Sequence, residues 1–348
     1  MVLSYWLDGF RRVWRAPAVL AGVFVVTLLA AAPLAIAMRG TIEAHLGRSL
    51  VANQVADGVD TDWWQEFAAQ ASGLGTTFRT SIIGFAATLD NISGVLDGEG
   101  QQATIIGALG VYLLAWLFLS GGIIDRYARQ RPTRAHGFFS AAGVYVWRFL
   151  RLGIIAGVVY WFLFAYVHAW LFDDLYERMT RDLSVERDAF VWRAGLYLVF
   201  GGLLVVVNAI VDYTKIRIVV EDRRSAVGSL LAAVAFVARN IGRVAGLYAI
   251  NALVFVVLVV VWAMVAPGAG GVGLSMWLGL LAGQAWVLAR LILKLQFLAS
   301  QTALFQQSLA HATYTAAPAL VWPESAAAEA VGNFSGPPSA QGRVADAS

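Results

Sequence analysis

Six long apolar segments divide this chain, and they limit what it can fold into more than any other feature. A helix rises ~1.5 Å per residue, so ~20 apolar residues cross a hydrocarbon layer ~30 Å thick. The segments run approximately from Ala16 to Met38, Ala103 to Ile124, Leu152 to Phe172, Ala194 to Val211, Ala245 to Ala266 and Gly273 to Leu293. The sequence therefore predicts an all-α fold, a polytopic membrane bundle of six transmembrane helices with interfacial amphipathic helices.

The composition supports a lipid environment. Hydrophobic residues make up 59% of the 348 residues and charged residues 14%, whereas a soluble domain is ~25% charged. A soluble protein this apolar would expose large apolar patches that cause association. The net charge of +3 does not indicate a nucleic-acid partner, because the arginines are scattered between apolar segments.

The charges of the connections predict the orientation, because Lys and Arg in short loops stay on the cytoplasmic side. Basic residues dominate before the first segment, between the second and third, and between the fourth and fifth. The connection 39–102 instead holds eight acidic and three basic residues. Six alternating spans with both termini in the cytoplasm satisfy every connection.

The first segment follows Arg15 without a clear small-x-small cleavage site, so we interpret it as a span rather than a signal peptide.

The remaining segments complete the predicted domain organisation. Residues 1–15 place apolar side chains at helical spacing beside arginines, which predicts an interfacial amphipathic helix; the alternative is a continuation of the first span. The membrane domain covers 16–316 and includes a periplasmic insertion, 40–102, with two or three short helices. One of these would begin with a capping box at Asp62 and Gln65. After the sixth span a helix would leave the membrane, and 317–348 has the composition of a disordered cytoplasmic tail.

The two long cytoplasmic connections resemble each other. Gly137 precedes Arg148 by the same spacing as Gly228 precedes Arg239, with apolar, alanine-bearing sequence between them. We predict cytoplasmic amphipathic helices near 133–150 and 223–243, within a parallel duplication of span, amphipathic helix and span.

Few residues suggest chemistry. Cysteine is absent, the four histidines lie far apart, and no metal-ligand spacing, Walker loop, GxSxG or HExxH occurs. We therefore expect no catalytic residues, no metal and no cofactor. His168 lies in an aromatic group near the outer end of the third span, which fits an interfacial belt; a proton relay is the alternative.

Polar residues inside the last three spans form the candidate site. Asn208 and Asp212 lie one turn apart, and Asn251 and Gln284 are expected at a similar depth in the inner leaflet, with Arg290 nearby. One interpretation is interhelical hydrogen bonding, with Asp212 paired to Lys215 or Arg217. The other is a polar layer that forms the floor of a cytoplasm-facing cavity, where Asp212 and Arg290 recognise a headgroup or solute.

A second set of candidates comprises arginines that could contact lipid headgroups on the cytoplasmic side. These are Arg11, Arg12, Arg15, Arg134, Arg148, Arg151, Arg223, Arg224, Arg239 and Arg243. They predict membrane lipids, chiefly anionic ones, as partners, with a protein partner or self-association as a further alternative.

The chain resembles known families in the layout of two stretches, in which spans alternate with amphipathic segments. These stretches are GGIIDRYARQRPTRAHGFFSAAGVYVWRFLRL and VDYTKIRIVVEDRRSAVGSLLAAVAFVARNIGRVAGL. The chain resembles uncharacterised bacterial six-span membrane proteins and is distantly similar to the YciC-type family and to the membrane domain of glycerophosphodiester phosphodiesterases. The resemblance implies a bacterial inner (cytoplasmic) membrane location. No soluble catalytic domain follows the spans in this chain, so lipid hydrolysis is not implied.

The leading hypothesis is a non-enzymatic integral membrane protein that organises lipid or partner proteins at the inner leaflet. The alternative is a small transporter or permease with a polar site in the inner half of spans four, five and six.

Overall fold

A computed structural model describes residues 2–47, 49–57, 60–78, 86–98, 103–267 and 273–311. Over these residues the chain is helical and contains no strand. Six helices are long and apolar enough to cross a membrane. The predicted all-α bundle with six candidate spans is therefore confirmed. The chain forms one compact unit over Met1–Gln306 and a second, Gln307–Ser348, of which only the end of the last helix is described.

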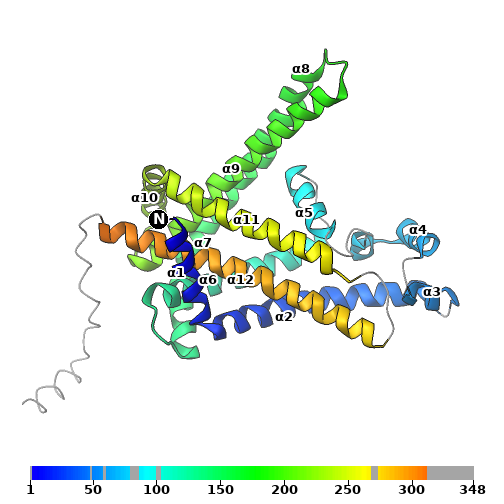
Figure 1. Ribbon diagram of the computed structural model, residues 1–348, viewed down its shortest axis with the longest axis horizontal. Coiled ribbons are helices and arrows are strands. Elements are labelled where there is room, and N and C mark those ends of the chain that lie inside the picture. Colours follow the sequence, from blue (N-terminus) through cyan, green and yellow to red (C-terminus); the bar gives the residue numbers. More distant parts are fainter. Residues whose placement is uncertain are drawn as a thin grey trace, which may run out of the picture. The chain divides into compact units, whose positions relative to one another are not determined.

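Each candidate span overlaps a predicted segment and extends beyond it at one end or at both. Figure 1 shows these helices. The helices continue past the apolar stretches because the backbone of a polar residue forms the same hydrogen bonds along a helix as that of an apolar one. Five spans are single helices: α2 (Pro17–Leu46), α6 (Ala103–Arg129), α9 (Glu186–Val220), α11 (Ile241–Val265) and α12 (Leu274–His311). The third span begins with α7 (Ala135–Phe162) and continues through the π-helical turns η3 (Leu163–His168) and η4 (Trp170–Leu175) into α8 (Tyr176–Thr180).

Shorter helices occur at the N-terminus and between spans. These are α1 (Val2–Trp14), α3 (Val51–Asp57), α4 (Thr61–Gln70), η1 (Gly73–Thr77), α5 (Ala86–Leu96) and α10 (Ala226–Arg239). The segment 40–102 thus contains short helices, as predicted. The capping box was placed wrongly, because the N-cap of α4 is Asp60, whose Oδ1 accepts a hydrogen bond from Trp63 N at 2.9 Å.

Two helical hairpins, α6 with α7 and α9 with α10, repeat the same local design. Each first helix is followed by a residue with a left-handed backbone, Gln130 at φ 52° and Asp222 at φ 49°. The second helices start at N-caps Arg134 and Ser225, in the register that Gly137 and Gly228 predict. The hairpins differ in how the second helix ends: α10 stops before Asn240 and α11 begins anew, whereas α7 continues without a break into the third span. The predicted separate helix near 133–150 is therefore the first half of α7.

The C-terminal half of α12 forms the centre of the compact unit. Residues from Leu295 to Phe305 are almost all buried, including Ser300 and Thr302, which are fully buried. Gln296 donates to Trp6 O at 2.6 Å, and Gln306 donates to Ala128 O at 3.0 Å. Its polar side chains therefore bond to neighbouring helices, so this segment stays packed in the helical bundle; that it leaves the membrane stays a prediction.

His168 holds the end of α5 against the third span. Its Nε2 lies 2.9 Å from Leu96 O, and its ring packs on Phe172 with centroids 4.6 Å apart. These contacts are those of a packed, hydrogen-bonded histidine.

Candidate functional site

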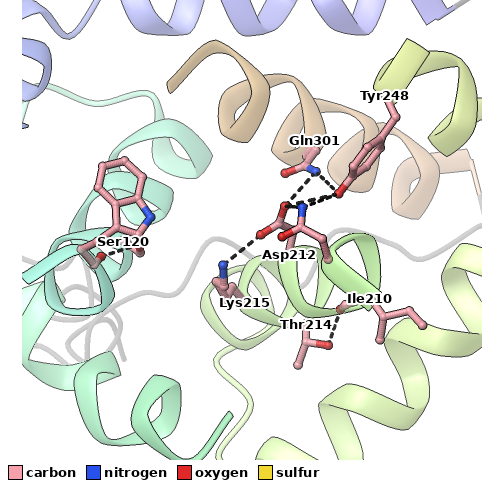
Figure 2. Close-up of polar contacts among 9 residues, drawn as sticks. Ser120, Ile210, Asp212, Thr214, Lys215, Tyr248 and Gln301 are labelled. Carbon is pink, nitrogen blue, oxygen red and sulfur yellow. Dashed lines mark hydrogen bonds and ion pairs between the residues drawn. The ribbon is translucent and has the colours of Figure 1, made fainter. Parts of the chain in front are cut away.

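Asp212 is the hub of a hydrogen-bonded network that joins α9, α11 and α12 (Figure 2). Lys215, less than one turn further along α9, donates to Asp212 Oδ1 at 2.9 Å. The other carboxylate oxygen, Oδ2, accepts from Asn208 at 3.2 Å, Gln301 at 3.3 Å and Tyr248 at 3.4 Å. The Asp212 side chain is only 14% exposed. A carboxylate with this many donors is satisfied within the protein.

Tyr248 closes the network across the helix interface. Its hydroxyl accepts hydrogen bonds from Asn208 and from Gln301, each at 3.2 Å. Its ring packs edge-on against Phe297 at 4.5 Å. Since buried polar groups inside a span need partners, this closed set stabilises the packing of three helices.

The predicted polar layer is only partly assembled. Asn208 and Asp212 come together, and Asp212 pairs with Lys215, as one interpretation expected. Asn251 instead donates to Leu247 O of its own helix at 2.8 Å. Neither Asn251 Oδ1 nor Gln284 Oε1 has a hydrogen-bond partner among the described residues, although both are buried.

Arg290 lines a groove between α2, α6, α11 and α12, which Tyr248 of the Asp212 network also lines. The groove has a volume of about 670 Å³, within the ~300–1,000 Å³ range of small-molecule sites. Its surface is mostly apolar. Its polar lining residues are Thr27, Tyr112, Tyr248, Asn251, Arg290 and Lys294.

The sequence analysis missed three residues of these sites: Tyr248, Gln301 and Lys294. Gln301 lies three turns beyond Arg290 on one helix face, a spacing that the sequence contains. It was missed because α12 was expected to have left the membrane by that point. Tyr248 and Lys294 lie within four residues of Asn251 and Arg290, so a search one turn either side of each polar residue would have found them.

The candidate headgroup arginines divide into two groups. Six side chains are exposed without an ion-pair partner among the described residues: Arg11, Arg15, Arg134, Arg151, Arg224 and Arg239. Four others have protein partners: Arg12, Arg148, Arg223 and Arg243.

Arg12 is the clearest departure from the predicted headgroup contacts. It is 6% exposed and donates to Tyr127 O at 3.0 Å and to Gln306 Oε1 at 2.7 Å, while pairing with Asp8 at 2.8 Å. Its guanidinium is therefore occupied by protein acceptors. Counting Arg12 as a headgroup contact was a mistake that arose because helical spacing alone does not say which face packs inward.

Among the described residues, no group of three or more His, Asp or Glu side chains could hold a metal ion. No family model, curated protein or solved structure matches the chain. The function must therefore be inferred from the geometry of the Asp212 network, the cationic groove and the exposed arginines.

Proposed function

We propose that this chain is a non-enzymatic integral membrane protein that binds and organises anionic lipid at the inner leaflet of a bacterial cytoplasmic membrane. The observation that carries the proposal is that two helices too short to span, α1 and α10, expose apolar faces next to arginines. A bilayer interface accommodates both features, because lipid acyl chains surround the apolar face and lipid phosphates bind the arginines.

Helix α1 has apolar side chains on its exposed face. Tyr5, Gly9, Arg12 and Val13 are buried against the bundle, whereas Leu3, Leu7, Phe10 and Trp14 are exposed. These four positions recur at helical spacing along one face. Each large apolar side chain left in water forgoes about 1.5–3 kcal/mol, so this face favours lipid over water.

Helix α10 has apolar residues on both faces. Ala233 and Val237 are buried against the bundle, while Val227, Leu231 and Val234 are exposed. The helix has 14 residues, which corresponds to a length of ~21 Å, shorter than the ~30 Å hydrocarbon layer. Its arginines lie at or just beyond its ends, where an interfacial helix would present them to headgroups.

Electrostatics specifies the kind of lipid. Near an anionic membrane surface each Lys or Arg contributes about 1 kcal/mol of attraction. The exposed arginines before α2, around the α6–α7 turn and around α10 belong to the side that the charge pattern assigns to the cytoplasm. We also propose that both termini lie in the cytoplasm and that the chain is related to YciC-type proteins.

The test uses the absence of cysteine from the chain. Single variants Leu7→Cys and Leu231→Cys, spin-labelled in phosphatidylglycerol nanodiscs, should show high oxygen and low nickel-chelate accessibility, as a label in lipid does. Arg224→Cys is the control and should show the opposite ratio. Labels at 7 and 231 that contact the nickel chelate freely would place α1 and α10 in water and refute the proposal.

The transporter alternative required Asn208, Asn251 and Gln284 to face one polar site. Their side chains have different surroundings, and Asp212 is satisfied by protein donors. Single cysteines at positions 208, 212, 251 and 284 distinguish the two functions. We expect protection of 208, 251 and 284 from a membrane-impermeant thiol reagent, with Arg224→Cys as the labelled control; labelling of all four would favour transport.

A further inference from the structure

The groove between α2, α6, α11 and α12 contains two cations and no acidic side chain among its described lining residues. Arg290 and Lys294 lie one turn apart on α12, and both side chains are exposed. Neither forms an ion pair with a described residue. Like charges one helical turn apart repel each other. Lys294 also feels the charges of Lys215 and Asp212, which oppose each other, so a bound anion would relieve the repulsion between Lys294 and Arg290.

Aromatic rings partly compensate for the two charges. The Lys294 ammonium lies 3.6 Å from the centre of the Trp116 ring and 3.5 Å from the Tyr112 hydroxyl. The Arg290 guanidinium lies 5.8 Å from the centre of the Trp286 ring. Cation–π contacts orient a cation but leave its hydrogen-bond donors available to a ligand.

The groove lies between the ends of the membrane-spanning helices. Thr27 is ~15 Å along α2 from Pro17, and Tyr112 is ~14 Å along α6 from Ala103, at ~1.5 Å per residue. Charged side chains at such positions are costly and usually mark a site that binds or moves a ligand.

Asn251 supplies a further requirement. It lines the groove and is 6% exposed; its amide group donates to Leu247 O, while its buried Oδ1 has no partner among the described residues. Since an unpaired buried acceptor costs free energy, this atom favours a ligand that brings a donor. The walls, which include Phe255, Val287 and Leu291, are apolar and suit hydrocarbon chains.

We propose that the groove binds one anionic phospholipid whose headgroup carries a hydroxyl. The phosphate lies between Arg290 and Lys294, a headgroup hydroxyl donates to Asn251 Oδ1, and the acyl chains lie along the apolar walls. This inference rests on the proposed function for the class of lipid, but it depends on residues inside the bundle rather than on the exposed arginines. The two can therefore fail separately.

Native mass spectrometry of the full chain tests the site. Protein in detergent is mixed with phosphatidylglycerol, phosphatidic acid or phosphatidylcholine, and lipid adducts are counted as collision energy rises. We expect one phosphatidylglycerol molecule to remain after the others dissociate. Loss of one charge-assisted contact, in Arg290→Gln or Lys294→Gln, should weaken this adduct by about tenfold or more.

Two control variants and one further site variant separate the site from its surroundings. Arg224→Gln and Arg239→Gln remove exposed arginines and should leave the tightly held adduct unchanged, even if they reduce the weaker ones. Asn251→Leu should reduce the preference for phosphatidylglycerol over phosphatidic acid, because the headgroup of phosphatidylglycerol carries alcohol hydroxyls and that of phosphatidic acid does not. Equal retention of phosphatidylglycerol and phosphatidylcholine, or loss of the adduct in Arg224→Gln but not in Arg290→Gln, would overturn the inference.

Two further measurements distinguish a lipid from a soluble anion and test the site without relying on a variant that folds. Glycerol 1-phosphate should not displace the lipid; if it competes at equal concentration, the ligand is a soluble phosphate ester and not a lipid. A photoactivatable phosphatidylglycerol on the unmutated chain needs no folded variant. We expect crosslinks on α11 and α12 near Asn251 and Arg290, and crosslinks confined to α1 and α10 would contradict the site.

Discussion

Gly9 of α1 lies directly against the backbone of Ser300 in α12. A β-carbon at position 9 would lie 2.6 Å from Ser300 N and 2.7 Å from its Cα, a separation that atoms do not tolerate. Small residues allow helices in membranes to approach this closely, and the close approach maximises van der Waals contact. Gly9 therefore fixes α1 on the central helix of the bundle.

Replacing Gly9 tests this contact. Gly9→Ala should lower the free energy of unfolding by about 1–3 kcal/mol, the usual cost of overpacking, because the obstacle is backbone rather than a movable side chain. Thermal unfolding in detergent measures the change. Gly22→Ala is the matched control, since a β-carbon at Gly22 meets nothing within 4 Å; equal unfolding temperatures for the two variants would refute the close contact.

Arg12 and its neighbour Arg11 differ in surroundings, not in chemistry. Arg12→Leu should destabilise the protein by about 3–5 kcal/mol, because it leaves Asp8 and Gln306 without their buried partner. Arg11 is exposed, so Arg11→Leu should change the free energy of unfolding by less than about 0.5 kcal/mol. A reversed order in a denaturant titration would mean that the guanidinium of Arg12 faces solvent or lipid.

Lys215 and Asp212 should behave as a coupled pair. Lys215→Met leaves the carboxylate without its ammonium partner, 2.9 Å away, and should cost about 1–3 kcal/mol. Once the lysine is gone, Asp212→Asn should cost little more, because the amide keeps an acceptor and carries no charge. A double-mutant cycle should give a coupling energy of about 0.5–3 kcal/mol, and purely additive effects would show that the pair does not interact.

Asp97, just after α5, predicts a pH dependence of stability. Hydrogen bonds from the hydroxyls of Tyr197 and Ser93 lower the pKa of Asp97 below its ordinary value of 3.8. The contribution to stability is fully present above that value and is lost as the pH falls through the lower pKa of the folded state. Tyr197→Phe should therefore be less stable than the original chain at about pH 7, and the difference should shrink toward about pH 3. A difference that stays constant over this range would show that the hydrogen bond does not depend on the carboxylate charge.

The candidate spans follow from the sequence because each records a local requirement. A helix that crosses hydrocarbon needs an unbroken run of apolar residues, and that run is visible without knowing what surrounds it. The two hairpins could be predicted equally well from the sequence, since their second helices begin in the register that Gly137 and Gly228 define. A local pattern did not predict that α7 would pass its arginines without a break while α10 would stop at Asn240.

The candidate sites could be predicted only in part from the sequence, because a polar side chain in a span does not specify its partner. Asn208, Asp212 and Lys215 lie within two turns of one helix, so helical spacing brought them together. Gln301 joins them from α12, and Asn251 does not, although both are polar groups in apolar surroundings.

The sequence by itself determined the six helices that are long and apolar enough to cross a membrane, because apolar length is a property of each segment alone. Which face of each helix points inward was decided by the tertiary structure. The burial of Arg12, the exposure of Trp14 and the placing of Arg290 and Lys294 in one groove depend on how helices far apart in the chain pack together. In a bilayer, apolar side chains are accommodated equally on the inward and the lipid-facing side, so hydrophobicity cannot choose between them; close backbone packing and interhelical hydrogen bonds make that choice.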